Sequence, residues 1–171
     1  MITISKLPYE RNAFAKYLAA SLFESRNELN DAFVDFRMLK KWGVEYPYLP
    51  EPLIRVTDKL KALEELTQYR KEYPEVKNWR FQKNEGEVVL IVEQGRAPIK
   101  YPMPGFEMIP VFRKSYYHSD FVWVREENGS EKIRSYPLYD IESTAIRDLE
   151  AKASAMIARK VGGLATKAAL A

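Results

Sequence analysis

The chain has 171 residues, and 46% of them are hydrophobic, which is enough to bury a core in one ordinary domain or two small ones. Its 27 basic and 24 acidic residues nearly balance, so no basic tract marks it as a nucleic-acid binder. The absence of cysteine excludes disulfides, thiolate metal sites, cysteine nucleophiles and a lipid-acceptor cysteine within this sequence. No run of 18 apolar residues occurs, so we expect neither a membrane span nor an export signal.

The N-terminal region predicts two helices joined by a short loop. Apolar residues recur every three or four positions between residues 8 and 25, which is typical of a helix with one buried face. A second helix follows, with Asn30 or Asp31 as its N-cap and Gly43 as its end. The short loop between them predicts an antiparallel hairpin.

A small and aromatic pattern runs through this hairpin. Small residues at Ala20 and Ala32 allow two helices to approach closely, and Phe23 and Phe36 fill the space around that contact. The pattern is typical of a tetratricopeptide-type hairpin, which is a scaffold and not a catalytic site. It does not recur cleanly 34 residues later, so we expect one good repeat and one degenerate or capping repeat.

A proline-rich connector, residues 44–52, comes next and predicts extended backbone. We expect Tyr46 and Tyr48 within it to seal the junction between the helical part and the β part. A helical stripe then continues over residues 53–72, with a bend near Ala62.

Beyond Pro74 the sequence predicts strands. Residues 88–92 form a continuous apolar block, which is typical of a strand buried on both faces, and we expect it to be the central strand. Residues 106–112 predict another strand, which Pro110 restricts to an edge.

A hairpin and a long helix complete the predicted elements. Asn128 and Gly129 lie between two apolar segments and predict a β-hairpin with Val124 opposite Ile133. After it, Asp140 is a good N-cap for a C-terminal helix that extends to about residue 168.

Together these elements predict an α+β fold with two domains. Tetratricopeptide-like helical hairpins occupy residues 1–74, and a β-sheet domain with the C-terminal helix occupies residues 75–171. We expect the helical hairpins to pack beside a small antiparallel sheet of about four strands, with the long C-terminal helix covering one sheet face.

The sequence offers no convincing catalytic or metal site. Ser115, His118 and Asp120 are neighbours in one loop, whereas a catalytic triad needs residues that converge from different elements. With one histidine, no cysteine and no calcium-loop spacing, a metal site is not supported. We therefore predict no catalytic residue, no metal and no cofactor.

Two places are candidates for binding a protein partner. One is the groove near the first helix, because helical-repeat surfaces bind extended peptides or helices. The other is the turn after the apolar block, where Arg96 and Lys100 could meet an acidic partner or could simply be solvated. The candidate residues of this turn are Glu93, Gln94, Gly95, Arg96, Pro98 and Lys100.

The helical hairpin, residues 86–100, residues 139–150 and residues 157–160 together resemble an uncharacterised family of Gram-negative envelope lipoproteins. The resemblance covers most of the chain from Tyr9 onward. It implies tetratricopeptide-like helices followed by a small β domain and a C-terminal helix, and an extracytoplasmic binding or assembly role with no established activity. Family members are typically longer, with a signal peptide, a lipid-bearing cysteine and more helical repeats, which this sequence lacks.

The sequence thus predicts a non-enzymatic protein–protein interaction or assembly module of the bacterial cell envelope, with protein partners and no nucleic acid. Periplasmic or outer-membrane association is expected if the chain is part of a longer protein, and the cytoplasm otherwise; membrane association would run only through a lipid anchor absent from this chain. The alternative is a glycan-binding or peptidoglycan-binding domain or hydrolase that uses loop aromatics such as Tyr101, Tyr116 and Tyr117.

Overall fold

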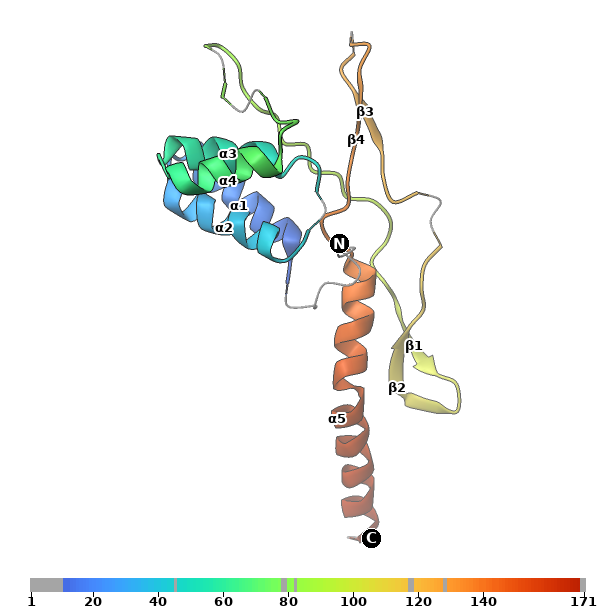
Figure 1. Cartoon of the computed structure of the whole chain (residues 1–171). Helices are drawn as coiled ribbons and strands as arrows, with labels where there is room; N and C mark the ends of the chain where they lie inside the picture. Colours follow the sequence, from blue (N-terminus) through green and yellow to red (C-terminus); the bar gives the residue numbers. More distant parts are fainter. Residues whose placement is uncertain are drawn as a thin grey trace. The chain divides into compact units, whose positions relative to one another are not determined.

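The computed structural model describes residues 11–44, 46–77, 80–81, 83–116, 119–127 and 129–169. Within them lie five helices and two antiparallel sheets of two strands each, which confirms the α+β class (Figure 1). The elements in chain order are α1 (Ala13–Ser25), α2 (Leu29–Lys41), α3 (Pro50–Lys59), α4 (Leu63–Glu72), β1 (Lys100–Met103), β2 (Phe106–Phe112), β3 (Trp123–Arg125), β4 (Lys132–Arg134) and α5 (Ile141–Ala169).

The chain divides into two compact units. The first unit comprises Met1–Glu93 and Phe121–Tyr139 and contains α1 to α4 with the β3–β4 hairpin. The second unit comprises Gln94–Asp120 and Asp140–Ala171 and contains the β1–β2 hairpin with α5. The predicted domain boundary at residue 74 stays a prediction.

The first two helices form the predicted antiparallel hairpin, but the residue that begins the second helix differs from the prediction. The side chain of Asn12 caps α1 by accepting a hydrogen bond from the Ala15 backbone N–H at 2.9 Å. Asn27 then takes a left-handed conformation (φ 62°), and the Glu28 N–H donates back to the Phe23 carbonyl at 2.8 Å. This tight reversal starts α2 at Leu29, so the prediction that Asn30 or Asp31 caps it is wrong.

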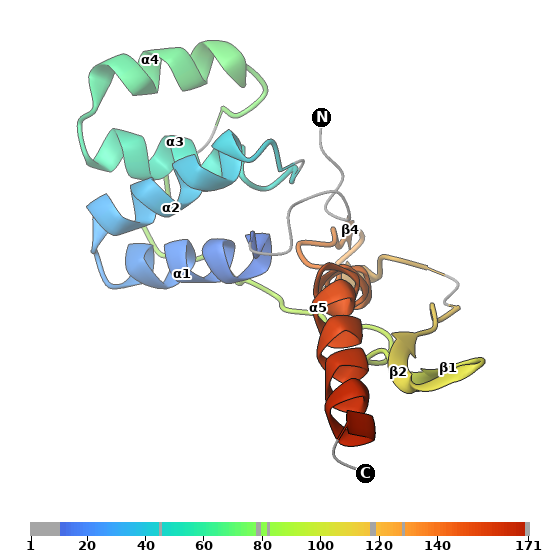
Figure 2. The same cartoon turned by 90° about the horizontal axis from the view of Figure 1, so that it is seen from below.

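The third predicted helix is broken into two. Lys61 has a left-handed conformation (φ 57°), and the Ala62 N–H donates to the Thr57 carbonyl at 3.2 Å. The expected bend near Ala62 is therefore a complete break, which creates a second hairpin from α3 and α4. Figure 2 shows the order of packing: α1 contacts α2, α2 contacts α3, and α3 contacts α4.

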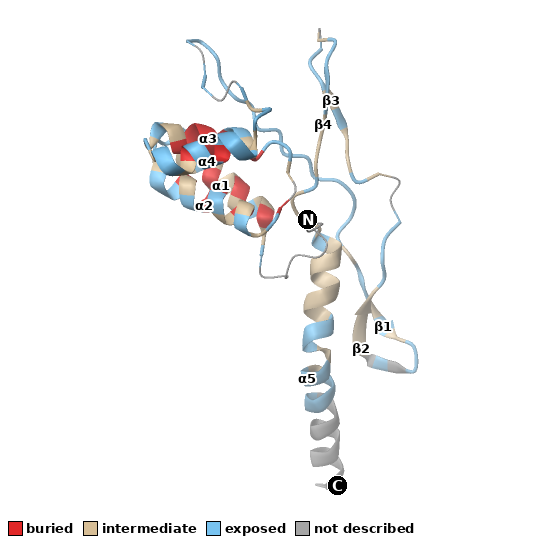
Figure 3. Ribbon diagram, viewed as in Figure 1, coloured by how far each residue is buried: buried red, intermediate tan, exposed pale blue. Residues whose placement is uncertain are grey.

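The core of the first unit lies between these helices (Figure 3). Ala20 and Ala32 are fully buried at the contact of α1 with α2, as the small-residue pattern predicts, and Phe36 is buried beside them. The ring of Phe36 meets that of Tyr17 edge to face, with centroids 5.8 Å apart. Phe23, the other expected aromatic residue, is only partly buried against this core, and the tetratricopeptide assignment itself stays a prediction.

Tyrosines join the helices to the β3–β4 hairpin within the first unit. The ring of Tyr46 lies 4.9 Å from that of Tyr17, and the ring of Tyr48 lies 5.8 Å from that of Tyr136. The Tyr48 hydroxyl also donates a hydrogen bond to the Arg134 carbonyl at 3.0 Å. The two connector tyrosines therefore seal the junction that the sequence predicts.

The described residues contain four strands, but these strands do not form the single sheet that we expected. In the β3–β4 hairpin Val124 pairs with Ile133, which confirms the predicted register. β1 pairs only with β2, where Pro102 lies opposite Pro110. Each hairpin closes through a short connection, which keeps the entropy cost of pairing small, and among the described residues each strand pairs with its sequence neighbour alone.

The prediction of a central, fully buried strand at residues 88–92 is wrong. These residues belong to no strand, and all five side chains are exposed. Because an isolated strand gains no ladder hydrogen bonds, an apolar run is buried as a strand only where a neighbouring strand can pair with it.

The C-terminal helix begins as expected. A carboxylate oxygen of Asp140 accepts a hydrogen bond from the Ser143 backbone N–H at 2.9 Å, which confirms Asp140 as its cap. Within the second unit α5 packs against β2. In the part of the chain that the structure describes, no helix combines the length and the apolar character that crossing a bilayer requires.

Leu39 and Leu63 give a matched test of the core. Leu39 is 1% exposed and Leu63 is 70% exposed. We expect Leu39→Ala to lower the free energy of unfolding by about 2–5 kcal/mol, because it leaves a cavity among the helices. Leu63→Ala should change it by less than about 0.5 kcal/mol. Urea denaturation followed by circular dichroism measures both, and equal losses would contradict this core.

Candidate partner-binding groove

A groove of about 550 Å³ lies on the first unit, along α1 and α3. One wall comes from the exposed side of α1, and the other comes from the irregular segment that follows α4. The lining residues are Leu18, Ser21, Leu22, Glu24, Ser25, Arg55, Lys59, Phe81, Glu87, Val89 and Ile91. The expected groove near the first helix therefore exists, and an apolar stripe and a charged cluster share its surface.

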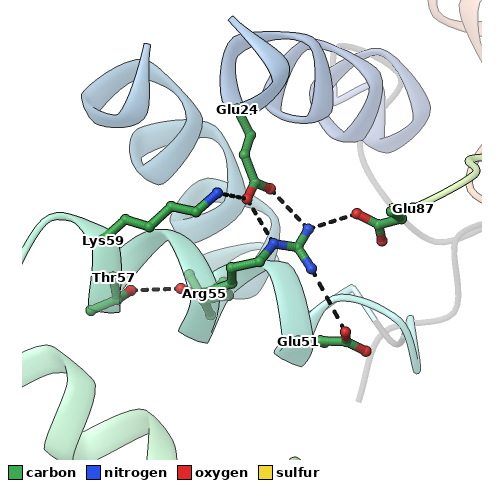
Figure 4. A network of polar contacts seen from close by, with 7 residues as sticks. Glu24, Glu51, Arg55, Thr57, Lys59 and Glu87 are labelled. Carbon is green, nitrogen blue, oxygen red and sulfur yellow. Dashed lines mark hydrogen bonds and ion pairs between the residues drawn. The ribbon is translucent and has the colours of Figure 1, made fainter. Parts of the chain in front are cut away.

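Arg55 is at the centre of the charged cluster (Figure 4). Its side chain is 1% exposed, and its Nε and Nη2 donate to the two carboxylate oxygens of Glu24 at 2.7 and 2.9 Å. Nη2 also donates to Glu87 at 2.6 Å, while Nη1 lies 3.7 Å from a carboxylate oxygen of Glu51. Lys59 adds a further bond to Glu24 at 2.9 Å. One buried guanidinium thus ties α1, α3 and residue 87 together.

The cluster holds its charges in the ionised state. Burial alone would raise the pKa of Glu24, but hydrogen bonds from Arg55 and Lys59 outweigh it and lower that pKa below its ordinary value. Burial likewise opposes the charge of Arg55, and the bonds and charges of Glu24 and Glu87 raise the Arg55 pKa instead. Three carboxylates face two cations here, so one negative charge remains in excess.

The apolar wall consists of an extended segment with alternating side chains. Val89 and Ile91 line the groove, and between them Leu90 is 60% exposed. Val88 is 85% exposed, and Val92 at the end of the run is 41% exposed. Side chains that alternate between two faces are the mark of β-like backbone. Five consecutive large apolar side chains therefore remain accessible to solvent.

The turn predicted to bind a partner follows directly. Its residues 93–97 are exposed, and Gly95 has φ +93°, a conformation that glycine adopts without strain. The Gln94 side-chain amide donates to the Ser119 carbonyl at 2.8 Å, and the Lys100 ammonium lies 5.8 Å from the Phe112 ring centroid. Arg96 is exposed, as a partner-binding cation would be, and its role stays a prediction.

The residues considered for catalysis and glycan binding lie in the second unit. His118 and Tyr117 lie outside the described residues. The Ser115 backbone N–H donates to a Glu142 carboxylate oxygen, and Tyr116 is fully exposed. The guanidinium of Arg113 lies over the ring of Tyr101, with the guanidinium carbon 4.6 Å from the ring centroid. Across the described ranges, no group of three histidines, cysteines or carboxylates is arranged to hold a metal ion.

Sequence reasoning missed the charged cluster. Arg55 follows two buried apolar residues, Leu53 and Ile54, and its neighbour Val56 is buried as well. A charged residue inside such an apolar run signals a buried ion pair, because a lone buried charge is costly. The distant partner Glu24 carries no comparable signal, since its contact spans two helices.

Comparisons of the chain with known protein families, with curated proteins and with solved structures found no match. The resemblance to envelope lipoproteins therefore stays an expectation drawn from residue patterns.

Glu24 and Glu51 give a matched test of the charged cluster. Glu24→Gln should lower the free energy of unfolding by about 3 kcal/mol, because it removes the main counter-charge of a buried arginine. Glu51 is half exposed and lies farther from Arg55, so Glu51→Gln should cost less than about 1 kcal/mol. Chemical denaturation at pH 7 measures both losses. Similar losses would show that Glu24 stabilises the buried Arg55 no more than Glu51 does.

The same cluster predicts a dependence on pH. Because the pKa of Glu24 is lowered in the folded state, its stabilisation is complete above the unfolded pKa of about 4.3 and is lost as the pH falls through the lower folded value. Between pH 7 and pH 3 the wild-type protein should therefore lose more unfolding free energy than Glu24→Gln. Denaturation curves at several pH values measure this difference, and parallel profiles would refute it.

Proposed function

We propose that this chain is a non-enzymatic protein–protein interaction or assembly module of the bacterial cell envelope. The observation that carries the proposal is the run of five exposed apolar side chains at residues 88–92, beside the groove on α1 and α3. Soluble proteins seldom leave a continuous apolar surface open to water unless it binds something.

The size of this run supports a partner of protein nature. Burying one valine or leucine side chain contributes about 1.5–3 kcal/mol, so covering several of them can sustain a specific complex. Shape supports the same class, because an extended run with a groove alongside fits a linear polypeptide segment. Charge supports a protein partner as well, since the cluster around Arg55 offers ionic contacts at one end of the apolar run.

The place of action follows from the resemblance to envelope lipoproteins. We propose the periplasmic side of the envelope, with association at the outer membrane, if the chain belongs to a longer protein, and the cytoplasm otherwise. The partners are proteins, and nucleic acid is not among them, because the basic and acidic residues of the chain nearly balance.

Capture of partners from an envelope fraction tests the proposal. The full chain serves as bait beside the variant Val88→Asp/Leu90→Asp, which places two charges on the apolar run. The control is Val34→Asp/Leu63→Asp, which alters two exposed apolar residues elsewhere on the first unit. We expect the wild-type and control baits to retain the same proteins, and the Val88/Leu90 variant to lose them at least about tenfold by quantitative mass spectrometry.

Two outcomes of this experiment would oppose the proposal. Equal retention by all three baits would show that the apolar run binds no partner. Retention of the bait on purified peptidoglycan, without any recovered protein, would favour the glycan-binding alternative. In either case circular dichroism of the variants shows whether they remain folded.

A further inference from the structure

The extended segment at residues 87–93 has the features of a β-strand without a neighbour. Glu87, Val89 and Ile91 are directed to the groove, and Val88 and Leu90 are directed away from it. This alternation with period two is the geometry of a strand. Among the residues that the structure describes, none forms a backbone hydrogen bond with residues 88–92. Within the described part of the chain, both edges of the segment are therefore unpaired.

We infer that this segment is completed by a strand from a partner protein, which pairs with its backbone and carries basic residues at both ends. The inference rests on the proposed function and specifies its mode of binding and the chemistry of the partner. Strand addition of this kind satisfies open backbone groups and buries alternating side chains in one step.

The charges at the two ends decide the kind of partner. Glu87 and Glu93 bracket the apolar run, six residues apart. Pairing of two copies of this segment, antiparallel about Leu90, places Glu87 opposite Glu93 twice, and a parallel pair in register places each glutamate opposite itself. Like charges directly opposite each other are destabilising. The segment therefore disfavours its own copy and favours a strand with lysine or arginine at those positions.

The ion pairs of Glu87 leave this preference intact. Arg55 binds Glu87, but Arg55 also binds Glu24 and lies near Glu51, so the cluster keeps one negative charge in excess. Glu93, at the other end, is exposed. A basic residue opposite Glu87 thus meets a cluster with one net negative charge, and a basic residue opposite Glu93 meets an exposed carboxylate. Both contributions fall with added salt.

Synthetic peptides test the inference directly. The probe is a seven-residue peptide in which valine alternates with threonine and lysine stands at both ends, acetylated and amidated so that only the lysines are charged. Its control has glutamate in place of both lysines. Fluorescence anisotropy with the full chain should show at least about fivefold tighter binding of the lysine peptide, and the difference should shrink at high salt.

Variants at exposed positions separate pairing from charge. Leu90→Pro and Leu90→Thr both remove the leucine side chain, but only Leu90→Pro also removes a backbone N–H from the segment, so Leu90→Pro should bind the lysine peptide at least about tenfold more weakly than Leu90→Thr. Glu93→Lys should reduce or reverse the preference for the lysine peptide. Hydrogen exchange should slow at residues 88–92 when the lysine peptide binds, and circular dichroism confirms that each variant is folded.

Three results would overturn the inference. The first is equal affinity of the chain for the two peptides, and the second is equal binding of the lysine peptide by Leu90→Pro and Leu90→Thr. The third is a concentration-dependent dimer that Leu90→Pro disrupts, which would identify a second copy of the chain as the occupant. If envelope partners still depend on Val88 and Leu90 while the peptides do not discriminate, the proposed function stands and strand addition falls.

Discussion

The first unit depends on the burial of one cation. Arg55 is buried in α3 beside the buried apolar residues Ile54 and Val56, so its charge must be matched within reach of its own side chain. Glu24 on α1 accepts two hydrogen bonds from it, Glu87 in the extended segment accepts one, and Glu51 lies 3.7 Å away. The requirement fixes how α3 faces α1, and it also determines where the chain passes after α4. The ion pair of Glu87 with Arg55 holds the start of the apolar run beside the groove, and the Phe81 ring, whose centroid lies 4.3 Å from the Arg55 guanidinium carbon, holds the preceding residues there.

Residue patterns predict the local elements well where one short stretch contains the whole signal. Asp140 is such a case, because the cap and the N–H that it receives are three residues apart. The pairing of Val124 with Ile133 is another, since a short turn sets the register of the hairpin. The buried alanines at positions 20 and 32 follow from helical spacing and the close approach that small side chains allow.

The same reasoning fails where the outcome depends on a distant partner. Residues 88–92 have every intrinsic property of a buried strand, yet burial requires a second strand beside them, and a single sequence does not show one. The N-cap of α2 depends on the left-handed conformation of Asn27, which places the start of the helix two or three residues earlier than predicted. The groove on α1 could be expected from helical hairpins in general. Its charged cluster could not, because Glu24 and Arg55 are brought together only by the packing of two helices.

The interleaving of the two units along the chain has a consequence for synthesis. The chain passes from one unit to the other three times, after Glu93, after Asp120 and after Tyr139. No single cut therefore separates the units, and the fragment from Gln94 to Ala171 carries residues of both. During translation the β1–β2 hairpin of the second unit is synthesised before α5, its packing partner. The delay between them is a few seconds at roughly 5–20 residues per second. In that interval the side of β2 that contacts α5 stays uncovered.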